Sequence, residues 1–234
     1  MNRSAVCGVV GLVALGLAGA GRGASAQITK QGNAYLFRMK FSKGEKMSYV
    51  INSSGSMPGA AAGQSAMKMT MPMVMTVKDV QGKIATVQME MGPMMMNGKA
   101  AGQQKQTMEV KLDDRGKPAG NSGSMQSVST QLPEKPLKVG ESYSTTNNVN
   151  VMGQQFAVKA TNKFVGTKRV GARNCAIIST SAAGSGAMKT AGTGTALLDM
   201  ADGSLVSMTM NQKVTVGQGA QAQTITNNVT ITRK

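Results

Sequence analysis

The residues in this sequence that could do chemistry at a regular spacing are methionines. Every odd residue from 67 to 75 is Met, and residues 85–91 carry Met89 and Met91 in the same alternation. Because a strand sends alternate side chains to opposite faces, each segment would gather its thioethers on one face. Thioethers are soft ligands suited to Cu(I), and they are also adaptable fillers of an apolar core. Packing and copper binding are therefore both open interpretations.

The two methionine segments are separated by turn-forming residues, so they are predicted to pair as antiparallel strands. The apolar residues of both segments have odd numbers, so the two apolar rows lie on the same face only if each pair of opposed residue numbers sums to an even value. One such register sets 75 opposite 87, 73 opposite 89 and 71 opposite 91. Residues 94–96 follow in a Gly- and Pro-containing segment that is predicted as an exposed loop. The candidate copper ligands are Met71, Met73, Met89, Met91, Met94, Met95 and Met96. If these side chains only pack, or are oxidised as scavengers, no cofactor is expected.

The remaining residues give little support to catalysis. The chain has no His, which removes the commonest general base and the commonest metal ligand. Most of the 10 acidic residues lie in predicted turns, where turn chemistry explains them. Cys175 is the one cysteine after residue 26 and lies in an apolar run, so we expect it to be buried and inert. We therefore expect no enzymatic activity.

Residues 1–26 have the parts of a secretory signal peptide. Arg3 precedes a short apolar run, and Ala24-Ser25-Ala26 forms an A-x-A cleavage site. The run is too short to span a bilayer, so we expect export to the periplasm or the extracellular space, with no transmembrane segment after cleavage. Removing residues 1–26 from 234 leaves 208, enough for one all-β domain or two small units.

The mature chain is strongly basic. Without Arg3 and Arg22, 24 Lys and Arg residues face 10 Asp and Glu residues, a net charge of about +14. Such a balance favours anionic neighbours. The basic residues are scattered and Trp is absent, so nucleic acid is not an expected partner. Scattered basic residues are also what an ordinary solvated surface shows. The partners that remain open are a lipid or another anionic amphiphile and a protein in the envelope.

Alternation with a period of two runs through the mature chain and predicts an all-β, antiparallel fold. Residues 34–53 are predicted as a β-hairpin, and Pro72, which lacks an N–H, indicates that its strand lies at an edge or is bulged. Further strands are predicted at 142–151, 154–165, 174–182, 190–199, 204–216 and 222–232. At most one short helix is expected, around residues 125–131.

A Gly-Glu turn occurs twice, within residues 41–47 and again within residues 137–143. In each half a later strand ends in an Asp- and Gly-containing turn, at 113–116 and at 199–203. These echoes predict a duplicated β unit, with residues 27–132 as the first unit and residues 133–234 as the second. We expect the two units to form one compact domain curled into a half-barrel or a sandwich.

Several turn and strand features occur together in this chain. They are the signal peptide, the opening at 41–49 with its Lys-Gly-Glu turn, the Met- and Thr-rich strand at 67–77, the segment at 132–143 and the hairpin at 198–205. In this layout the chain resembles a family of exported bacterial proteins of unknown function, a resemblance that covers most of the mature chain. It implies a fold and a compartment, and no activity. More remotely, the layout is similar to the half-barrel lipoprotein carriers of the bacterial envelope, which hold an acyl chain.

Together these features favour a non-catalytic envelope protein that binds an apolar or amphiphilic anionic ligand. A methionine-lined surface adapts to varied ligands, and a cupped sheet with a basic exterior suits an anionic head group. Cu(I) binding through thioethers is one alternative, and a structural or protein-contact β domain with no small ligand is another. Ligand binding predicts an unfilled concave surface, copper binding predicts convergent sulfurs, and a structural role predicts neither.

Overall fold

The computed structural model describes residues 27–55, 67–101, 105–119, 131–151, 154–185, 188–216 and 223–234. The predicted signal peptide lies outside these residues, as does the predicted helical turn at 125–131 except for Gln131, which is not helical. The described part of the chain is built of strands and their connections, without a helix. In that part, accordingly, there is no helix of the length and apolar character needed to cross a membrane.

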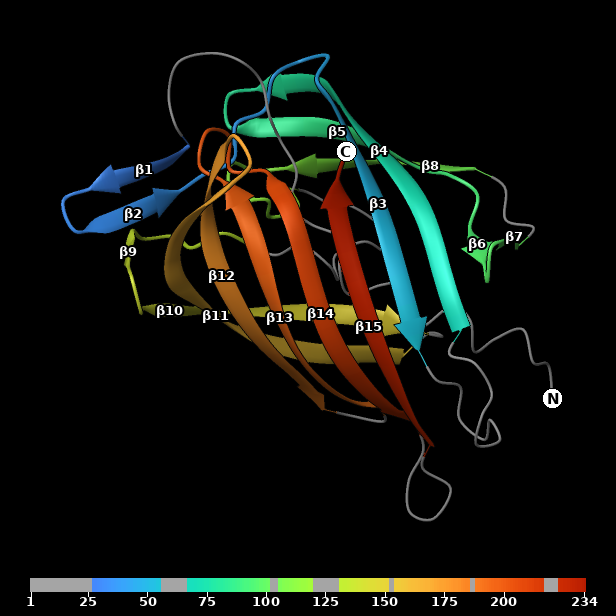
Figure 1. Cartoon of the computed structure of the whole chain (residues 1–234). Helices are drawn as coiled ribbons and strands as arrows, with labels where there is room; N and C mark the ends of the chain where they lie inside the picture. The colour runs from blue at the N-terminus through green and yellow to red at the C-terminus, as the bar shows by residue number, and fades with distance from the viewer. Residues whose placement is uncertain are drawn as a thin grey trace.

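One antiparallel sheet makes up most of the structure (Figure 1). Along its path the strands are β10 (Ser142–Val151), β11 (Gln154–Val170), β12 (Arg173–Ser185), β13 (Met188–Asp199), β14 (Leu205–Val216), β15 (Gln223–Arg233), β3 (Lys46–Gly55), β4 (Met67–Gln81), β5 (Ile84–Met91) and β8 (Gln106–Leu112). Two short strands, β6 (Met95–Met96) and β7 (Lys99–Ala100), extend the sheet beside β4. The all-β, antiparallel prediction is confirmed, and each strand predicted between residues 142 and 232 is present.

The sheet curls around a concave face, which we call the inner face. In Figure 1, β10 and β11 pass behind β12 to β15, so the two ends of the sheet turn back on the same side. β15 pairs with β3, which joins the strands of both sequence halves into one continuous sheet. Within the described residues the edge strands β10 and β8 do not pair with each other, so the curl stays open. Alternate side chains of each strand face inward and form the apolar core.

A small second sheet covers one end of the inner face. It consists of β1 (Ile28–Gln31), β2 (Ala34–Phe37) and β9 (Leu137–Lys138). The rings of Tyr35 and Phe37 both meet the ring of Phe164 on β11 edge to face, with centroids 5.1 Å apart. Edge-to-face contacts of buried rings add to the stabilisation from burial alone. The small sheet is thereby packed onto the main sheet.

The predicted hairpin of residues 34–53 is wrong. β2 pairs with β1 and β9 in the small sheet, whereas β3 pairs with β4 and β15 in the main sheet. The segment between β2 and β3 is held by other partners, because the N–H of Met39 donates to the carbonyl of Asp114 and the N–H of Lys40 to that of Asp202. Alternation identified both strands, but these long-range bonds separate them into two sheets.

Two Gly-Glu turns have the same geometry at the starts of β3 and β10. Gly44 and Gly140 have φ angles of +82° and +91°, which glycine adopts without steric cost. Their N–H groups donate to the carbonyls of Val77 and Phe164, at 2.8 and 2.7 Å. Val77 and Phe164 in turn donate their own N–H groups to the carbonyl of the glutamate in each turn, at 2.9 Å. The sequence echo therefore corresponds to one turn built twice.

The strands after these turns also repeat. β3, β4, β5 and β8 pair in that order, as do β10, β11, β12 and β13. The pairing slips by one residue directly after Val77 in β4 and directly after Phe164 in β11. An aspartate lies at the end of each last strand, Asp113 directly after β8 and Asp199 as the last residue of β13, and its carboxylate accepts the N–H two residues further on. We call these the first and second four-strand sets, and the shared anchors match their positions one to one.

Candidate functional site

The methionines of β4 and β5 face each other in a different register from the predicted one. Met73 lies opposite Met91 and Met75 lies opposite Met89, two residues away from the predicted pairing. The observed register follows from the two-residue turn between Gln81 and Ile84, in which Gly82 has a φ of +59°, and from the one-residue slip after Val77. The even-sum rule still holds over this stretch, so the thioethers of both strands lie on the inner face.

Pro72 does not lie at an edge, so of the two alternatives expected for its strand, an edge or a bulge, the edge is wrong. It lies opposite Val50 on β3, and β4 has neighbours on both sides. On the other side the pairing of β4 changes from β5 to β6 at this point, and the carbonyl of Pro72 accepts the N–H of Gly92 at 2.8 Å. A Cβ on Gly92 would lie 2.6 Å from Cγ of Pro72, so the two rest directly on each other. The break between β5 and β6 accommodates the missing N–H.

Residues 94–96, predicted as an exposed loop, are half-buried and partly strand. Met95 and Met96 form β6, in which Met96 lies opposite Met69 and Met95 opposite Thr70. The turn to β7 runs through Asn97 and Gly98, which both have positive φ. Of the seven candidate ligands, Met73 and Met91 therefore lie directly opposite each other. Met71 lies opposite Ile51, and Met96 lies opposite Met69, which was not among the candidates.

Burial decreases along β4 from one end of the inner face to the other. Met73 and Met75 are each 4% exposed and Val77 is fully buried. Met67, Met69 and Met71 have the same orientation by alternation but are only half-buried. The inner face is therefore packed from Met73 to Val77 and accessible near the beginning of β4. We call this accessible region the open end.

Small residues line the inner face at the open end of the second four-strand set. The inward positions beyond Phe164 and its neighbours are half-buried and mostly small, and they are Thr145, Val158, Ala160, Ala182, Gly184, Thr190, Gly192 and Gly194. A Cβ at Gly194 would lie 2.6 Å from the carbonyl oxygen of Thr209, so that position excludes a larger residue. The inner face at the open end thus carries flexible thioethers on the first half of the sheet and mostly Ala, Gly and Thr, with Val158, on the second half.

Buried polar groups lie beside these small residues. Tyr143, Asn162 and Thr180 are neighbours across β10, β11 and β12, and Asn162 is 1% exposed. Thr180 Oγ1 donates to Asn162 Oδ1 at 2.8 Å. Asn162 Nδ2 and the Tyr143 hydroxyl are buried and have no hydrogen-bond partner among the described residues. Burial raises the pKa of the Tyr143 phenol, so it remains a neutral donor.

Sequence analysis did not identify this polar row. Asn and Thr are common on the solvated face of strands, so they did not stand out in the second half of the chain. The available signal was the position of Asn162 two residues before Phe164, which alternation places on the same face.

No family model matches the chain, and a search of curated proteins finds no similar sequence. The open end and its polar row are therefore the basis for the function proposed below.

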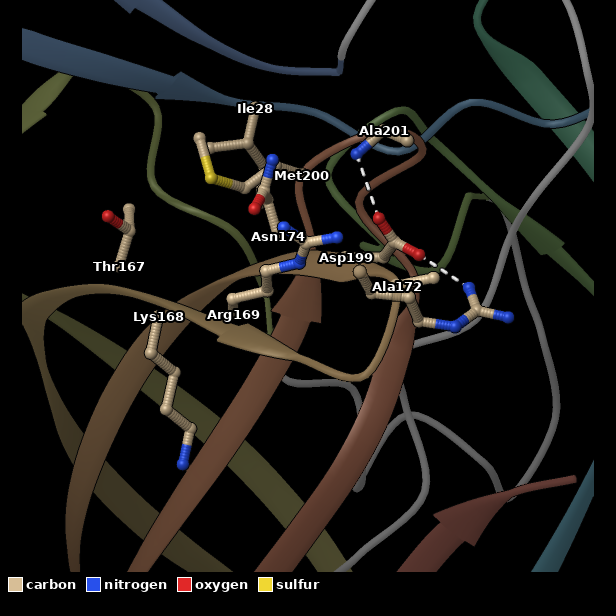
Figure 2. A pocket seen from close by; sticks show the side chains of 10 residues that line it. Ile28, Thr167, Lys168, Arg169, Ala172, Asn174, Asp199, Met200 and Ala201 are labelled. Carbon is tan, nitrogen blue, oxygen red and sulfur yellow. Dashed lines mark hydrogen bonds and ion pairs between the residues drawn. The ribbon is translucent and has the colours of Figure 1, made fainter.

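A separate basic pocket of about 770 Å³ lies around the hairpin that joins β11 and β12 (Figure 2). Lys168, Arg169 and Arg173 contribute positive charge to its lining. The carboxylate of Asp199 accepts hydrogen bonds from the Arg173 guanidinium and the N–H of Ala201, and the first of these bonds raises the pKa of Arg173. Figure 2 shows Lys168 pointing away from Asp199. The pocket therefore does not focus its three cations on one point.

The basic pocket and the open end lie at opposite ends of β12. Arg173 begins this strand and Gly184 lies near its far end, so roughly 35 Å of extended chain separates them at the usual rise of a strand. The small sheet also lies beside the pocket, because Ile28, a pocket residue, donates its N–H to the carbonyl of Met200. The two regions are therefore separate features of the surface.

Proposed function

We propose that this protein is a non-catalytic binding protein of the cell envelope, which holds an apolar or amphiphilic anionic ligand at the open end. The observation that carries this proposal is the decrease of burial along β4, from Met73 and Met75 at 4% exposure to half-buried Met67, Met69 and Met71. The same face and the same residue type are packed at one end and accessible at the other. Core methionines would be expected to be covered along their whole length.

The two halves of the open end suit an acyl chain or another apolar group. Thioether side chains are flexible and polarizable, so they adjust to a ligand without a fixed shape. The second half of the sheet presents Ala and Gly at most of its inward positions there, and these project little into the concave side. Binding sites for small molecules are typically concave and mostly apolar, with a few polar groups that orient the ligand.

Charge and export support the anionic and envelope parts of the proposal. After removal of residues 1–26 the chain carries a net charge of about +14, which attracts anionic amphiphiles by long-range electrostatics. The sequence pattern of residues 1–26, which is that of a signal peptide, favours export to the periplasm or the extracellular space. The curled sheet with a cap at one end also supports the analogy with half-barrel lipoprotein carriers, an analogy of shape alone.

Native mass spectrometry of the protein purified from the envelope of its source organism tests this function. We expect an additional mass of lipid size that is released on denaturation. Ala182→Phe fills the open end from the inner face and should remove that mass. Ala183→Phe, on the exposed outer face of the same strand, is the matched control and should retain it. If the protein carries no such mass and the stripped protein also fails to bind dodecyl phosphate, the proposal is wrong.

Copper(I) binding is the second candidate, supported by opposed and accessible methionines. Met73 lies opposite Met91, and half-buried Met69 lies opposite half-buried Met96. Two or more soft ligands on neighbouring strands could bind one Cu(I). In an anaerobic titration against a Cu(I) chelator, retention of stoichiometric copper would favour this function.

Two groups of Leu variants locate such a copper site while preserving apolar packing. One group replaces Met71, Met73, Met89 and Met91, and the other replaces Met94, Met95 and Met96. If one group of variants loses copper and the other retains it, the copper ligands lie among the residues replaced in the group that loses it. If neither copper nor an amphiphile is retained, a structural or protein-contact role, which is the third candidate, is the better description.

A further inference from the structure

The polar row of the second four-strand set occupies positions that methionines occupy in the first. The shared turns, bulges and strand pairings match Tyr143, Asn162, Thr180 and Gly194 to Met47, Met75, Met89 and Met108, respectively. Both rows cross four neighbouring strands on the inner face. One row is made entirely of thioethers, whereas the other carries a phenol, an amide and a hydroxyl.

The fold does not require polar side chains at these positions. Met47 and Met75 are 1% and 4% exposed, so the first set places apolar side chains here and packs them well. A buried polar group that serves only stability is expected to have its hydrogen bonds satisfied within the protein. The second set instead leaves Asn162 Nδ2 and the Tyr143 hydroxyl without a partner among the described residues. Stability alone therefore does not account for this row.

The free hydrogen-bonding capacity of the row consists mainly of donors. Asn162 Oδ1 already accepts the Thr180 hydroxyl, which leaves the two N–H bonds of the amide. The Tyr143 hydroxyl lies on the adjacent strand, because Tyr143 and Asn162 are direct cross-strand partners. Side chains of opposed residues lie about 5 Å apart at Cβ, so the two orphan donors belong to adjacent side chains on one face.

We propose that Tyr143 and Asn162 form a head-group subsite, which takes a carboxylate or phosphate oxygen of the ligand bound at the open end. This inference rests on the proposed ligand-binding function and specifies which end of the ligand is recognised. An acceptor oxygen would satisfy the orphan donors, and hydrogen bonds to a charged acceptor are stronger than neutral ones. The acyl part would extend over the Ala and Gly positions toward the half-buried methionines.

Binding of four probes to the ligand-stripped protein, measured by isothermal titration calorimetry, tests the subsite. Dodecanoate, dodecyl phosphate and dodecyltrimethylammonium share one chain length and differ in the head group, and inorganic phosphate has no chain. We expect the two anionic amphiphiles to bind at least ~10-fold more tightly than the ammonium, because only they satisfy the buried donors. Inorganic phosphate should bind far more weakly than dodecyl phosphate, because it contributes no apolar surface. Equal affinity for inorganic phosphate and dodecyl phosphate would identify a free anion site and overturn the head-group assignment.

Two variants and one matched control isolate the donors. Tyr143→Phe removes one donor, and the double variant Asn162→Met, Thr180→Met copies the residues of the first set. Each should weaken dodecyl phosphate binding by ~10-fold or more and leave dodecyltrimethylammonium binding unchanged. Ser204→Ala is the control, since Ser204 is a fully buried polar residue away from the open end whose hydroxyl already accepts a hydrogen bond from the Arg233 guanidinium. It should change neither affinity.

The outcomes separate this inference from the function on which it rests. If all three amphiphiles bind wild type equally, ligand binding stands and the head-group subsite is wrong. If no amphiphile binds, both proposals are wrong. A structural role for the row predicts that Tyr143→Phe lowers the melting temperature without changing head-group preference, and this result would also overturn the subsite. A crystal structure of the dodecyl phosphate complex gives a further test. An ordered water bound to Asn162 Nδ2 and the Tyr143 hydroxyl, with the phosphate bound elsewhere, would also overturn the subsite.

Discussion

The contact at Gly203 gives a quantitative test of how the β13–β14 turn holds the segment after β2. Gly203 has a φ of +74°, and a Cβ built there would lie 2.2 Å from the carbonyl oxygen of Arg38 and 3.2 Å from Cα of Met39. Both neighbours are backbone atoms, so relief requires a shift of the chain by roughly 1 Å. The adjacent bond from the Lys40 N–H to the Asp202 carbonyl, 3.1 Å long, lies in the path of that shift.

Gly203→Ala combines two costs that a matched variant separates. A positive φ for Ala costs about 1 kcal/mol, and Gly171→Ala should show that cost alone, because its φ is +58° and no atom lies within 4 Å of its Cβ position. At Gly203 the displaced backbone adds the weakened hydrogen bond and looser packing of Met39, which is 3% exposed. We expect a total loss of about 3–5 kcal/mol in the free energy of unfolding.

Urea denaturation followed by circular dichroism provides the measurement. The slope of the free energy with denaturant should be equal in both variants, so that the midpoints report stability alone. The expected result is a loss that is larger for Gly203→Ala than for Gly171→Ala by about 2–4 kcal/mol. Equal losses within about 0.5 kcal/mol would refute the close approach of the turn to residues 38 and 39.

Three further predictions concern burial and charge. Met75→Ala should cost about 2–4 kcal/mol of unfolding free energy and Met67→Ala less than about 1 kcal/mol, and equal costs by urea denaturation would contradict the burial gradient. Burial raises the pKa of the Asp202 carboxyl, so its ionisation destabilises the fold as pH rises through that pKa. Between about pH 4 and about pH 7, the free energy of unfolding should therefore fall less for Asp202→Asn than for wild type, as measured by denaturant titrations. An equal fall in both proteins would contradict this role of Asp202. Cys175 is fully buried with a raised thiol pKa, so iodoacetamide should modify it only after unfolding; rapid labelling of the native protein would show an exposed thiol.

Local patterns in the sequence were sufficient to predict most of the strands. Alternation depends only on the two-residue repeat of an extended chain, and it placed Met73 and Met75 on one face of β4 without further information. The second-half strands follow the same logic. The Gly-Glu echo was readable because Gly44 and Gly140 occupy a backbone conformation that other residues disfavour, so the turn leaves a signature in residue type.

Pairing partners and registers depended on contacts that the sequence pattern does not contain. The turn at Gly82 and the slip after Val77 place the β4–β5 register two residues away from the predicted one. Each changes which residues pair, but the segments before and after it still alternate, so the sequence pattern does not reveal the change. The separation of β2 from β3 likewise depends on hydrogen bonds to Asp114 and Asp202, which are distant in sequence.

By itself the sequence determined that the chain forms alternating strands, that methionines share one face and that a turn is repeated, because these properties depend on neighbouring residues. Only the tertiary structure decided which part of that face is covered. The small sheet packs on Phe164, whereas Met67 is half-buried, a difference that no local pattern distinguishes. It also decided that Asn162 and Tyr143 are buried donors beside each other, because their meeting requires β10 to pair with β11 on the inner face of a curled sheet.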